Sequence, residues 1–146
     1  MTVLAVRHTG IVVSNMETSL PFYRDLLGLE VWWDQIEAGS VTEAITGVTE
    51  AKLRTVKMKA LDGVSIELIQ YLNVPQPVPP LPTASAVGCS HAALQVENID
   101  ALYQKATAAG LRFHTPPLVT PGGKAKVTYC RDPEGVIIEL VELINP

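Results

Sequence analysis

Two six-residue segments, one near the end of each half, are the same except at their third position. They are Gly63-Val64-Ser65-Ile66-Glu67-Leu68 and Gly135-Val136-Ile137-Ile138-Glu139-Leu140. Both copies are apolar and β-branched and follow a turn signal, which is typical of a strand that begins after a tight turn. Strand alternation places Glu67 on one face of its strand and Ile66 and Leu68 on the other. Each copy therefore carries one carboxylate in an apolar strand, where a buried charge is costly unless it is paired or bound to a metal.

The similarity extends back to the beginning of each half. Three residues recur 83 positions later and a dipeptide recurs 82 positions later: His8, Val13 and Asn15 as His91, Val96 and Asn98, and Gly28-Leu29 as Gly110-Leu111. The closing segments are only 72 positions apart, because residues 40–53 have no full counterpart in the second half. Self-similarity on this scale predicts two copies of a strand–helix–strand–strand–strand unit. Neither copy can bury its own sheet face, so we expect the two to close over a common cavity, within one chain or between two chains.

Length and composition exclude several classes of protein. The chain has 146 residues, of which 47% are hydrophobic and 18% are charged, and its net charge is −4. This length fits one domain, and the apolar fraction excludes intrinsic disorder. Scattered basic residues in an acidic chain argue against nucleic-acid binding, and no apolar run is long enough to span a membrane. The N-terminus has no signal-peptide pattern, and two cysteines, Cys89 and Cys130, are too few for a disulfide framework, so we expect a cytoplasmic protein.

A proline-rich segment separates the two halves. Residues 74–82 hold five of the 11 prolines. Neither a helix nor a central strand tolerates this density, so we predict an extended linker, with a polyproline ligand for a partner domain as the alternative. We predict one domain over residues 1–146, divided into a first module at 1–73, a linker at 74–87 and a second module at 88–146.

Local patterns assign elements to each module. In the first we expect a strand at 5–13, a helix capped by Asn15 and closed by Gly28, a strand at 29–34, a short helix within 40–53 broken by Gly47, and a hairpin of residues 53–60 and 64–71 turned by Asp62-Gly63. In the second we expect strands at 88–96, 111–115, 124–130 and 136–143, a helix at 99–109 and a loop at 116–123. Pro21 lies within the first helical pattern, so that helix starts late or has a distorted first turn.

Each module carries one histidine on its first strand and one glutamate on its last. A single histidine of this kind is more often a satisfied core residue, and a single glutamate a salt-bridge partner. Two of each at equivalent positions of a repeat are brought towards one axis by pseudo-two-fold symmetry, which predicts a shared metal site. The predicted ligands are His8, Glu67, His91 and Glu139. Nitrogen and oxygen donors of this mix suit a divalent ion such as Zn, Ni, Co, Mn or Fe(II).

Three parts of the chain resemble the vicinal oxygen chelate superfamily, which includes glyoxalase I, methylmalonyl-CoA epimerase, extradiol dioxygenases and the bleomycin and fosfomycin resistance proteins. They are His8-Thr9-Gly10-Ile11-Val12-Val13 with residues 19–29, residues 88–100 with Ala108-Ala109-Gly110, and Asp132-Pro133-Glu134-Gly135 with residues 136–140. The resemblance covers nearly the whole chain. It implies an α+β fold in which two βαβββ modules form an eight-stranded, cupped mixed sheet around one metal. It also implies that the four residues named above occupy the family's metal positions.

The four-ligand set resembles glyoxalase I, while the second module resembles methylmalonyl-CoA epimerase. Both imply a divalent-metal-dependent lyase or isomerase that removes a proton α to a carbonyl and stabilises the enolate. Resemblance to glyoxalase I implies that Glu139 or Glu67 is the catalytic base. Resemblance to the epimerase implies that Glu139 is one base and that an acid after the second strand, Glu43 or Glu50, opposes it.

Two other functions remain open. Residues 129–135, followed by Glu139, match the end of the extradiol dioxygenase signature, which makes an Fe(II) dioxygenase the first alternative. That class carries a histidine a few residues upstream of Tyr129, and His114 is farther away and expected on the surface. The second alternative is a metal-free protein that binds a drug or another small molecule, although the complete ligand set counts against it. In every case we expect a small-molecule partner, and a homodimer, because family members often complete their cups by dimerising.

Several further residues are candidates for the pocket. Trp32 and Trp33 alternate along a strand, so we expect one to pack and the other to cover a substrate. Cys89 shares a face with His91 and is expected to be a small buried thiol. Three basic residues either meet an anionic substrate or are simply solvated: Arg54, Lys124 and Lys126.

Overall fold

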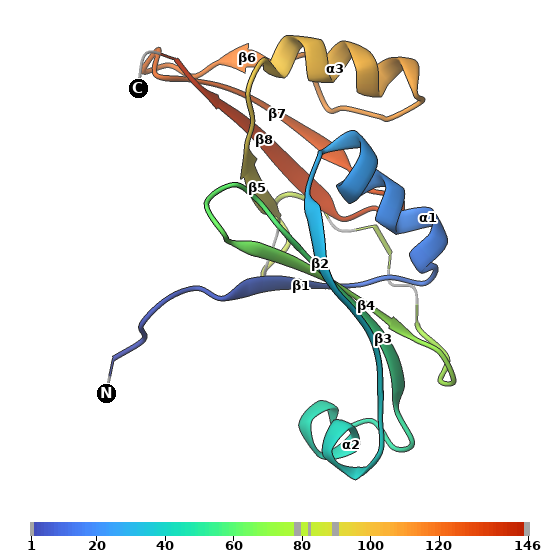
Figure 1. Cartoon of the computed structure of the whole chain (residues 1–146). Helices are drawn as coiled ribbons and strands as arrows, with labels where there is room; N and C mark the ends of the chain where they lie inside the picture. Colours follow the sequence, from blue (N-terminus) through green and yellow to red (C-terminus); the bar gives the residue numbers. More distant parts are fainter. Residues whose placement is uncertain (1, 78–79, 82, 89–90, 145–146) are drawn as a thin grey trace. The chain divides into compact units, whose positions relative to one another are not determined.

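The computed structural model describes residues 2–77, 80–81, 83–88 and 91–144 (Figure 1). The chain divides into two compact units, Met1–Val78 and Pro79–Pro146. Each unit contains one four-stranded mixed sheet, so the α+β class and the two βαβββ modules predicted from the repeat are confirmed. No helix among the described residues is long and apolar enough to cross a membrane.

The first unit is built on strands β1 (His8–Val12), β2 (Glu30–Ala38), β3 (Lys52–Lys59) and β4 (Ser65–Tyr71). Their order in the sheet is β1-β4-β3-β2, with β1 parallel to β4 and the other pairs antiparallel. Helix α1 (Met16–Pro21) connects β1 to β2, and the core contains Met16, Tyr23, Val56, Met58 and Leu68, all fully buried. Alternation along β4 therefore sends Leu68 into the core and leaves Glu67 for the opposite face.

The second unit repeats this arrangement with strands β5 (Ala92–Gln95), β6 (Leu118–Val119), β7 (Ala125–Arg131) and β8 (Ile137–Leu143). Their order is β5-β8-β7-β6, and β5 is parallel to β8. Helix α3 (Ile99–Ala108) is anchored by Ile99 and Ala106, which are buried with Ile138 and Leu140 of β8. Equivalent strands thus occupy equivalent places in the two sheets, as the sequence repeat predicts.

The helix of the first unit begins where the sequence predicts and is distorted elsewhere. The Asn15 side chain accepts a hydrogen bond from the Glu17 N–H and caps α1. Pro21 disturbs the end of α1, not its first turn, and the chain continues as a π-helical turn, η1 (Phe22–Leu26). There the Leu27 N–H donates to the Phe22 carbonyl, five residues back. Because Pro21 has no N–H to donate, the regular α-helical ladder is broken at that point.

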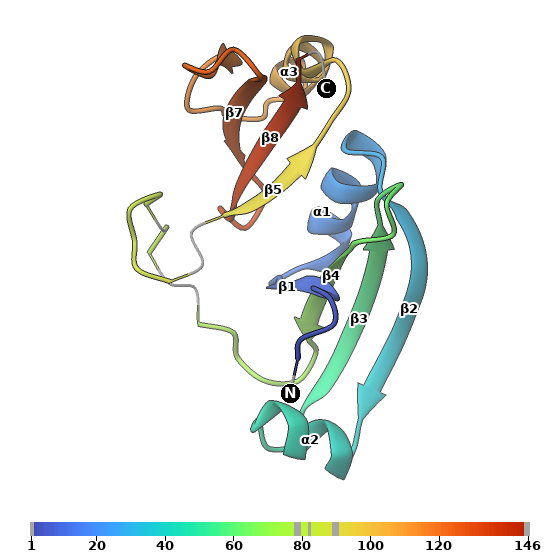
Figure 2. The same cartoon turned by 90° about the vertical axis from the view of Figure 1, so that its left-hand side faces the viewer.

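The insertion at residues 40–53 forms α2 (Ser40–Thr46), which ends at Gly47 as expected. Gly47 has a φ of 69°, a left-handed conformation that glycine adopts without strain. Figure 2 shows α2 beyond the ends of β2 and β3, and none of its residues is buried. Helix α2 therefore adds little to the core of the first unit.

The second strand of the second unit is displaced from its predicted place. The strand expected at 111–115 is reduced to a single bridge between Phe113 and Cys130. Strand β6 instead forms within residues 116–123, where we expected a loop, and it pairs with β7 through Leu118 and Val127. It has only two residues, because the second half is shorter than the first between its helix and its closing hairpin.

Candidate functional site

The first histidine–glutamate pair lies on neighbouring parallel strands. In the register of β1 and β4, His8 stands opposite Ser65 and Gly10 stands opposite Glu67, so His8 and Glu67 share one face of the sheet. His8 Nε2 lies 2.9 Å from Glu67 Oε2. A Cβ added to Gly10 would come within 3.9 Å of that same oxygen. This is an ordinary van der Waals distance, so a residue as small as alanine also fits beside the pair.

The second pair repeats this geometry in the second unit. His91 Nε2 lies 3.0 Å from Glu139 Oε2. Glu139 stands opposite Ala93 of β5, and Ala93 takes the place that Gly10 has in the first unit. The side chains of Glu67 and Glu139 are 11% and 20% exposed, so both carboxylates are largely withdrawn from water but not sealed from it.

One neighbour distinguishes the two pairs. In the first unit Lys57 stands opposite Glu67, and its Nζ lies 3.3 Å from Glu67 Oε1. In the second unit Tyr129 stands opposite Glu139, and its ring centre lies 5.2 Å from that of His91. Both oxygens of Glu67 are thus in ion pairs, whereas among the described residues Glu139 forms an ion pair through one oxygen only. The two pairs are alike in their donors and different in charge.

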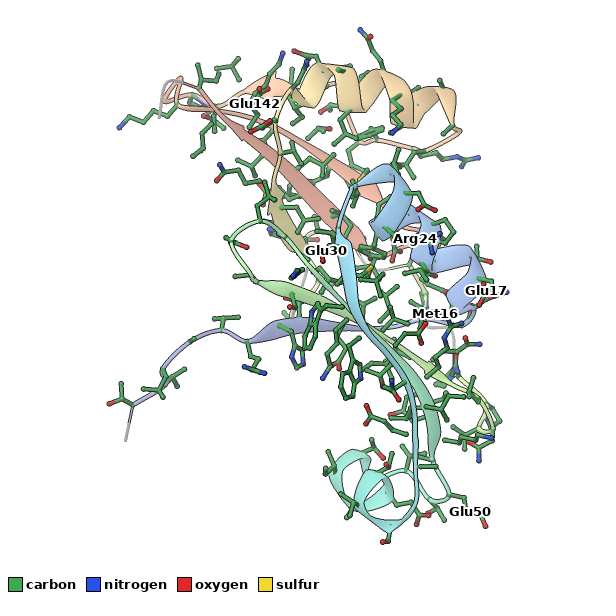
Figure 3. All side chains as sticks on the ribbon, viewed as in Figure 1. Met16, Glu17, Arg24, Glu30, Glu50 and Glu142 are labelled. Carbon is green, nitrogen blue, oxygen red and sulfur yellow. The ribbon has the colours of Figure 1, made fainter. Side chains whose placement is uncertain are left out.

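Equivalent contacts tie each helix to the strand that carries the glutamate. In the first unit the Met16 N–H donates to the side chain of Gln70, three residues after Glu67. In the second, the Asn98 and Ile99 N–H groups donate to Glu142, three residues after Glu139, and Figure 3 shows Glu142 beside the start of α3. A side-chain oxygen at this place satisfies N–H groups that a helix leaves unpaired in its first turn.

Two of the basic residues considered for anion binding have a structural role instead. Arg54 donates to Glu17 in the first turn of α1 and to Asp34 on β2. The guanidinium of Arg54 lowers the pKa of the Asp34 carboxyl, chiefly through these hydrogen bonds. At the equivalent position of the second unit, Lys126 pairs with Asp100 in the first turn of α3. Lys124 is exposed at the start of the closing hairpin.

These ion pairs were missed at the sequence level, although the repeat contains their signal. Arg54 and Lys126 are separated by the same 72 positions as the two glutamates, and Glu17 and Asp100 by the same 83 positions as the two histidines. Matching each half's charges against the two shifts would have paired them.

The acids proposed to oppose Glu139 lie away from the first pair. Figure 3 shows Glu50 next to α2, and Glu43 is part of that helix. The β3 end that follows α2 begins at Lys52, five residues before Lys57, which corresponds to about 17 Å of strand. Neither acid therefore reaches the surroundings of Glu67 in the first unit.

The two tryptophans do not separate as alternation predicts. A β-bulge between Val31 and Trp33 shifts the register of β2 against β3. The two indole rings lie 6.2 Å apart, and they remain 45% (Trp32) and 40% (Trp33) exposed. Neither tryptophan packs into the core. The extra residue of the bulge explains the difference, because it moves the chain by one step of the two-residue strand period.

The remaining candidates in the second unit are His114 and the cysteines. His114 is exposed as expected, but its ring centre lies 6.0 Å from that of Tyr129, since the bridge at Phe113 aligns this segment with β7. Cys130 is a free thiol, and burial raises its pKa to about 12, so it is not a nucleophile at neutral pH. Cys89 lies outside the described residues.

Each pair has the donor types and spacing that a divalent cation requires. Two adjacent ligands of a six-coordinate ion with bonds of about 2.1 Å are about 3 Å apart, as the two donor atoms of each pair are. Such a distance is also that of a hydrogen-bonded ion pair. Among the described residues no group of three or more His, Cys, Asp or Glu side chains is placed to hold a metal ion. The structure therefore brings the four predicted ligands together as two pairs, one in each unit.

The repeated βαβββ module, with a histidine on or just before its first strand and a glutamate on its last, defines a class of two-module α+β proteins. The sequence profile of the Glyoxalase/Bleomycin resistance protein/Dioxygenase superfamily matches residues 5–140, and the chain belongs to this superfamily. Membership shows the fold family and a general association with small molecules, and it leaves the particular activity open.

Solved structures with the same fold include proteins of different descriptions. A glyoxalase family protein from Bacillus cereus is 23% identical, with 99% of this chain and 97% of that chain covered and a TM-score of 0.90. TnmS3, an antibiotic binding protein from Streptomyces sp. CB03234, is 20% identical, with 99% of both chains covered and a TM-score of 0.66. A superfamily member from Sphaerobacter thermophilus is 25% identical, with 96% and 98% covered and a TM-score of 0.63. None of the curated proteins matches the chain significantly.

Proposed function

We propose that this protein is a divalent-metal-dependent enzyme of the glyoxalase I or methylmalonyl-CoA epimerase type, which removes a proton α to a carbonyl. The observation that carries the proposal is a histidine–glutamate contact at equivalent positions of both modules, with 2.9 Å between Nε2 and Oε2 in the first and 3.0 Å in the second. In the first module Glu67 also has Lys57 as a partner, so His8 is not needed there to compensate the carboxylate.

In this proposal the two pairs together hold one metal ion, within one chain or across a homodimer. The ligands are His8 and Glu67 from the first module and His91 and Glu139 from the second. Zn, Ni, Co, Mn and Fe(II) all suit two imidazole nitrogens and two carboxylates. When bound, the ion acts as a Lewis acid that stabilises negative charge on a carbonyl oxygen.

Glu139 is the better catalytic base of the two glutamates. Glu67 has both oxygens in ion pairs, with His8 and with Lys57, and it can accept a proton only by sharing or breaking one of them. Glu139 is paired through Oε2 alone among the described residues, and its side chain is more exposed than that of Glu67. We therefore assign proton abstraction to Glu139 Oε1, with Glu67 as the alternative base.

The proposal is tested first on metal content. Elemental analysis of the purified, metal-loaded protein is compared with the single variants His8→Ala and His91→Ala and with the double variant. We expect each single variant to weaken metal binding and the double variant to abolish it. His114→Ala is the matched control, because it removes a histidine that belongs to neither pair. Wild-type metal content in the double variant would contradict the ligand assignment.

Activity is then measured on a panel of hemithioacetal, acyl-CoA and catechol substrates. Turnover of a hemithioacetal or an acyl-CoA ester supports the proposed reaction. Turnover of neither, with a full metal complement, would contradict it.

One observation favours a second function, an Fe(II) extradiol-type dioxygenase. His114 is distant from Tyr129 in sequence but has its ring beside that of Tyr129, which in turn lies beside His91. A histidine near a two-histidine, one-carboxylate iron site fits that chemistry, with Glu67 not required as a ligand. Iron in the purified protein and oxygen consumption with catechols would support the dioxygenase over the lyase or isomerase. A protein that binds small molecules without any metal is the remaining alternative, and the same elemental analysis tests it.

A further inference from the structure

A pocket of about 150 Å³ adjoins the first histidine–glutamate pair, entirely within the first unit. It is lined by three basic side chains together with His8, Trp32 and Ser65. The basic residues are Arg7, Lys57 and Lys59. Lys57 and Lys59 belong to β3, and Arg7 precedes β1. These residues are far apart in the sequence and become neighbours through the pairing of strands in the sheet.

The basic side chains exceed the acids that face them. Lys57 Nζ lies 3.3 Å from Glu67, and Lys59 Nζ lies 3.4 Å from Glu30. Among the described residues Arg7 forms no ion pair. The residues that line the pocket thus include three cations and no carboxylate, in a chain whose overall charge is −4. The pocket is a local positive site on an acidic protein and does not reflect its general surface charge.

The two lysine ion pairs are loose enough for an anion to compete with them. Charge-assisted N–H···O hydrogen bonds are usually about 2.7–2.9 Å long, and both of these contacts are longer. The Lys57 and Lys59 side chains are also 26% and 42% exposed, so water and solutes reach them. Trp33 supports Lys57 from the other side, since the ammonium lies 5.6 Å from the indole ring centre.

The pocket has room for a small charged group. Its volume of about 150 Å³ is enough for a carboxylate or a phosphate with its first attached atoms. Trp32 adds an apolar wall against which the carbon atoms of such a group can lie.

We propose that this pocket binds the oxyanion end of the substrate, a carboxylate or a phosphate, so that the substrate of the proposed enzyme is an anionic carbonyl compound. The inference rests on the proposed function for the identity of the ligand as substrate. Anion binding itself is a property of Arg7, Lys57 and Lys59 and does not depend on the metal. His8 borders the pocket, so an anion held there leaves the rest of the molecule next to the first pair.

Tryptophan fluorescence provides the test, because the chain has two tryptophans and both lie beside the pocket or its lysine. The metal-free protein is titrated with inorganic phosphate and, separately, with malonate, at constant ionic strength and with chloride as the reference anion. We expect a saturable change with a Kd of about 1 mM for at least one of the two. The stronger ligand identifies the group as phosphate or carboxylate. No saturable change with either anion would overturn the proposal.

Variants locate the binding. Arg7→Gln and Lys57→Gln should each weaken the bound anion about tenfold, as the loss of one charged hydrogen bond predicts. Lys52→Gln is the matched control, since it removes a lysine from the same strand that does not line the pocket. Arg7 is exposed and outside the sheet, so its variant is informative even if Lys57→Gln fails to fold. Equal affinity in wild type and Arg7→Gln would contradict the assignment.

The pocket and the proposed function can fail separately. If phosphate or malonate binds but the protein takes up no metal, the anion-binding proposal stands and the proposed metal-dependent enzyme is wrong. If the protein binds metal and turns over an uncharged substrate, and Arg7→Gln has no effect on this turnover, the anion-binding proposal is wrong and the proposed enzyme stands. With an anionic substrate, Arg7→Gln should raise KM about tenfold and leave kcat unchanged.

Discussion

The first and second modules present the same two donors in different electrostatic surroundings. Glu67 is held between His8 and Lys57, while Glu139 is held by His91 beside the ring of Tyr129. Lys57 and Tyr129 occupy equivalent positions, 72 residues apart, directly opposite the two glutamates. A repeated fold has thus kept the pair and changed its neighbour. In the proposed function the two modules share metal binding and divide the remaining work, with anion recognition in the first and proton transfer in the second.

Substitution of the two glutamates should have the largest effect, and it tests whether proton transfer belongs to the second module. Glu139→Gln removes the proposed base and should lower kcat about 1,000-fold, in the range that general acid–base catalysis contributes. Glu67→Gln keeps an oxygen donor at the metal and should cost about tenfold. Steady-state kinetics on the substrate found in the panel measures both, with metal content as the control. Equal losses in the two variants would show that the modules do not divide the chemistry.

The next largest effect is expected from replacing Tyr129, the residue opposite Glu139. Tyr129→Lys gives Glu139 the kind of ammonium contact that Glu67 has, and it should lower kcat about tenfold, as expected for one charged contact that must be broken. Tyr129→Phe keeps the ring beside His91 and should retain turnover. Thermal unfolding of both variants separates a loss of activity from a loss of fold. Full activity of Tyr129→Lys would show that the contact with Lys57 is not what makes Glu67 the poorer base.

A smaller effect concerns the residues that tie each helix to its strand. Glu142 accepts two backbone N–H groups at the start of α3, whereas Gln70 accepts one at the start of α1. Glu142→Ala should lower the free energy of unfolding by about 1–2 kcal/mol, and Gln70→Ala by about 1 kcal/mol, because only Glu142 adds a negative charge at a helix N-terminus. Urea denaturation measures the two values, with exposed Glu97→Ala as the control. A reversed order would contradict this account of the anchors.

The smallest expected effect is on the ion pairs of Arg54. This residue is half-buried while its partners Glu17 and Asp34 are well exposed, so Arg54→Gln should cost about 0.5 kcal/mol. Arg54 lowers the pKa of Asp34 in the folded protein, so its contribution is present above the unfolded pKa and is lost as the pH falls through the lower, folded pKa. Urea midpoints between about pH 7 and pH 2 should therefore converge for wild type and variant at the acid end. A difference in urea midpoint between wild type and Arg54→Gln that stays constant over this pH range would exclude Asp34 as the titrating partner.

Much of the fold follows from patterns that local chemistry enforces. Asn15 and Asn98 cap helices because their side chains reach unpaired N–H groups, and Gly63 turns the β3–β4 hairpin in a left-handed conformation. The repeat also predicted that one histidine and one glutamate from each module contribute to the site. That the two meet within each module follows from the parallel register of β1 with β4 and of β5 with β8, which the sequence alone did not provide.

The features that sequence reasoning missed depend on small irregularities and on cross-strand neighbours. The bulge at Val31 and Trp33 brings the two indoles to one region, and no residue type in the sequence announces it. The anion pocket combines Arg7 with Lys57, which are neighbours only through the sheet. His114 was expected away from Tyr129 because the two are far apart along the sequence, and the bridge between Phe113 and Cys130 brings their rings together.

Whether two pairs, one from each module, hold one metal ion is decided by calorimetric titration of the metal-free protein with Ni²⁺ or Co²⁺. We expect one tight site per chain, lost equally in His8→Ala and in His91→Ala, because each variant removes one ligand of the same set. Two sites per chain, each lost in only one of the two variants, would show that the pairs bind metal independently of each other.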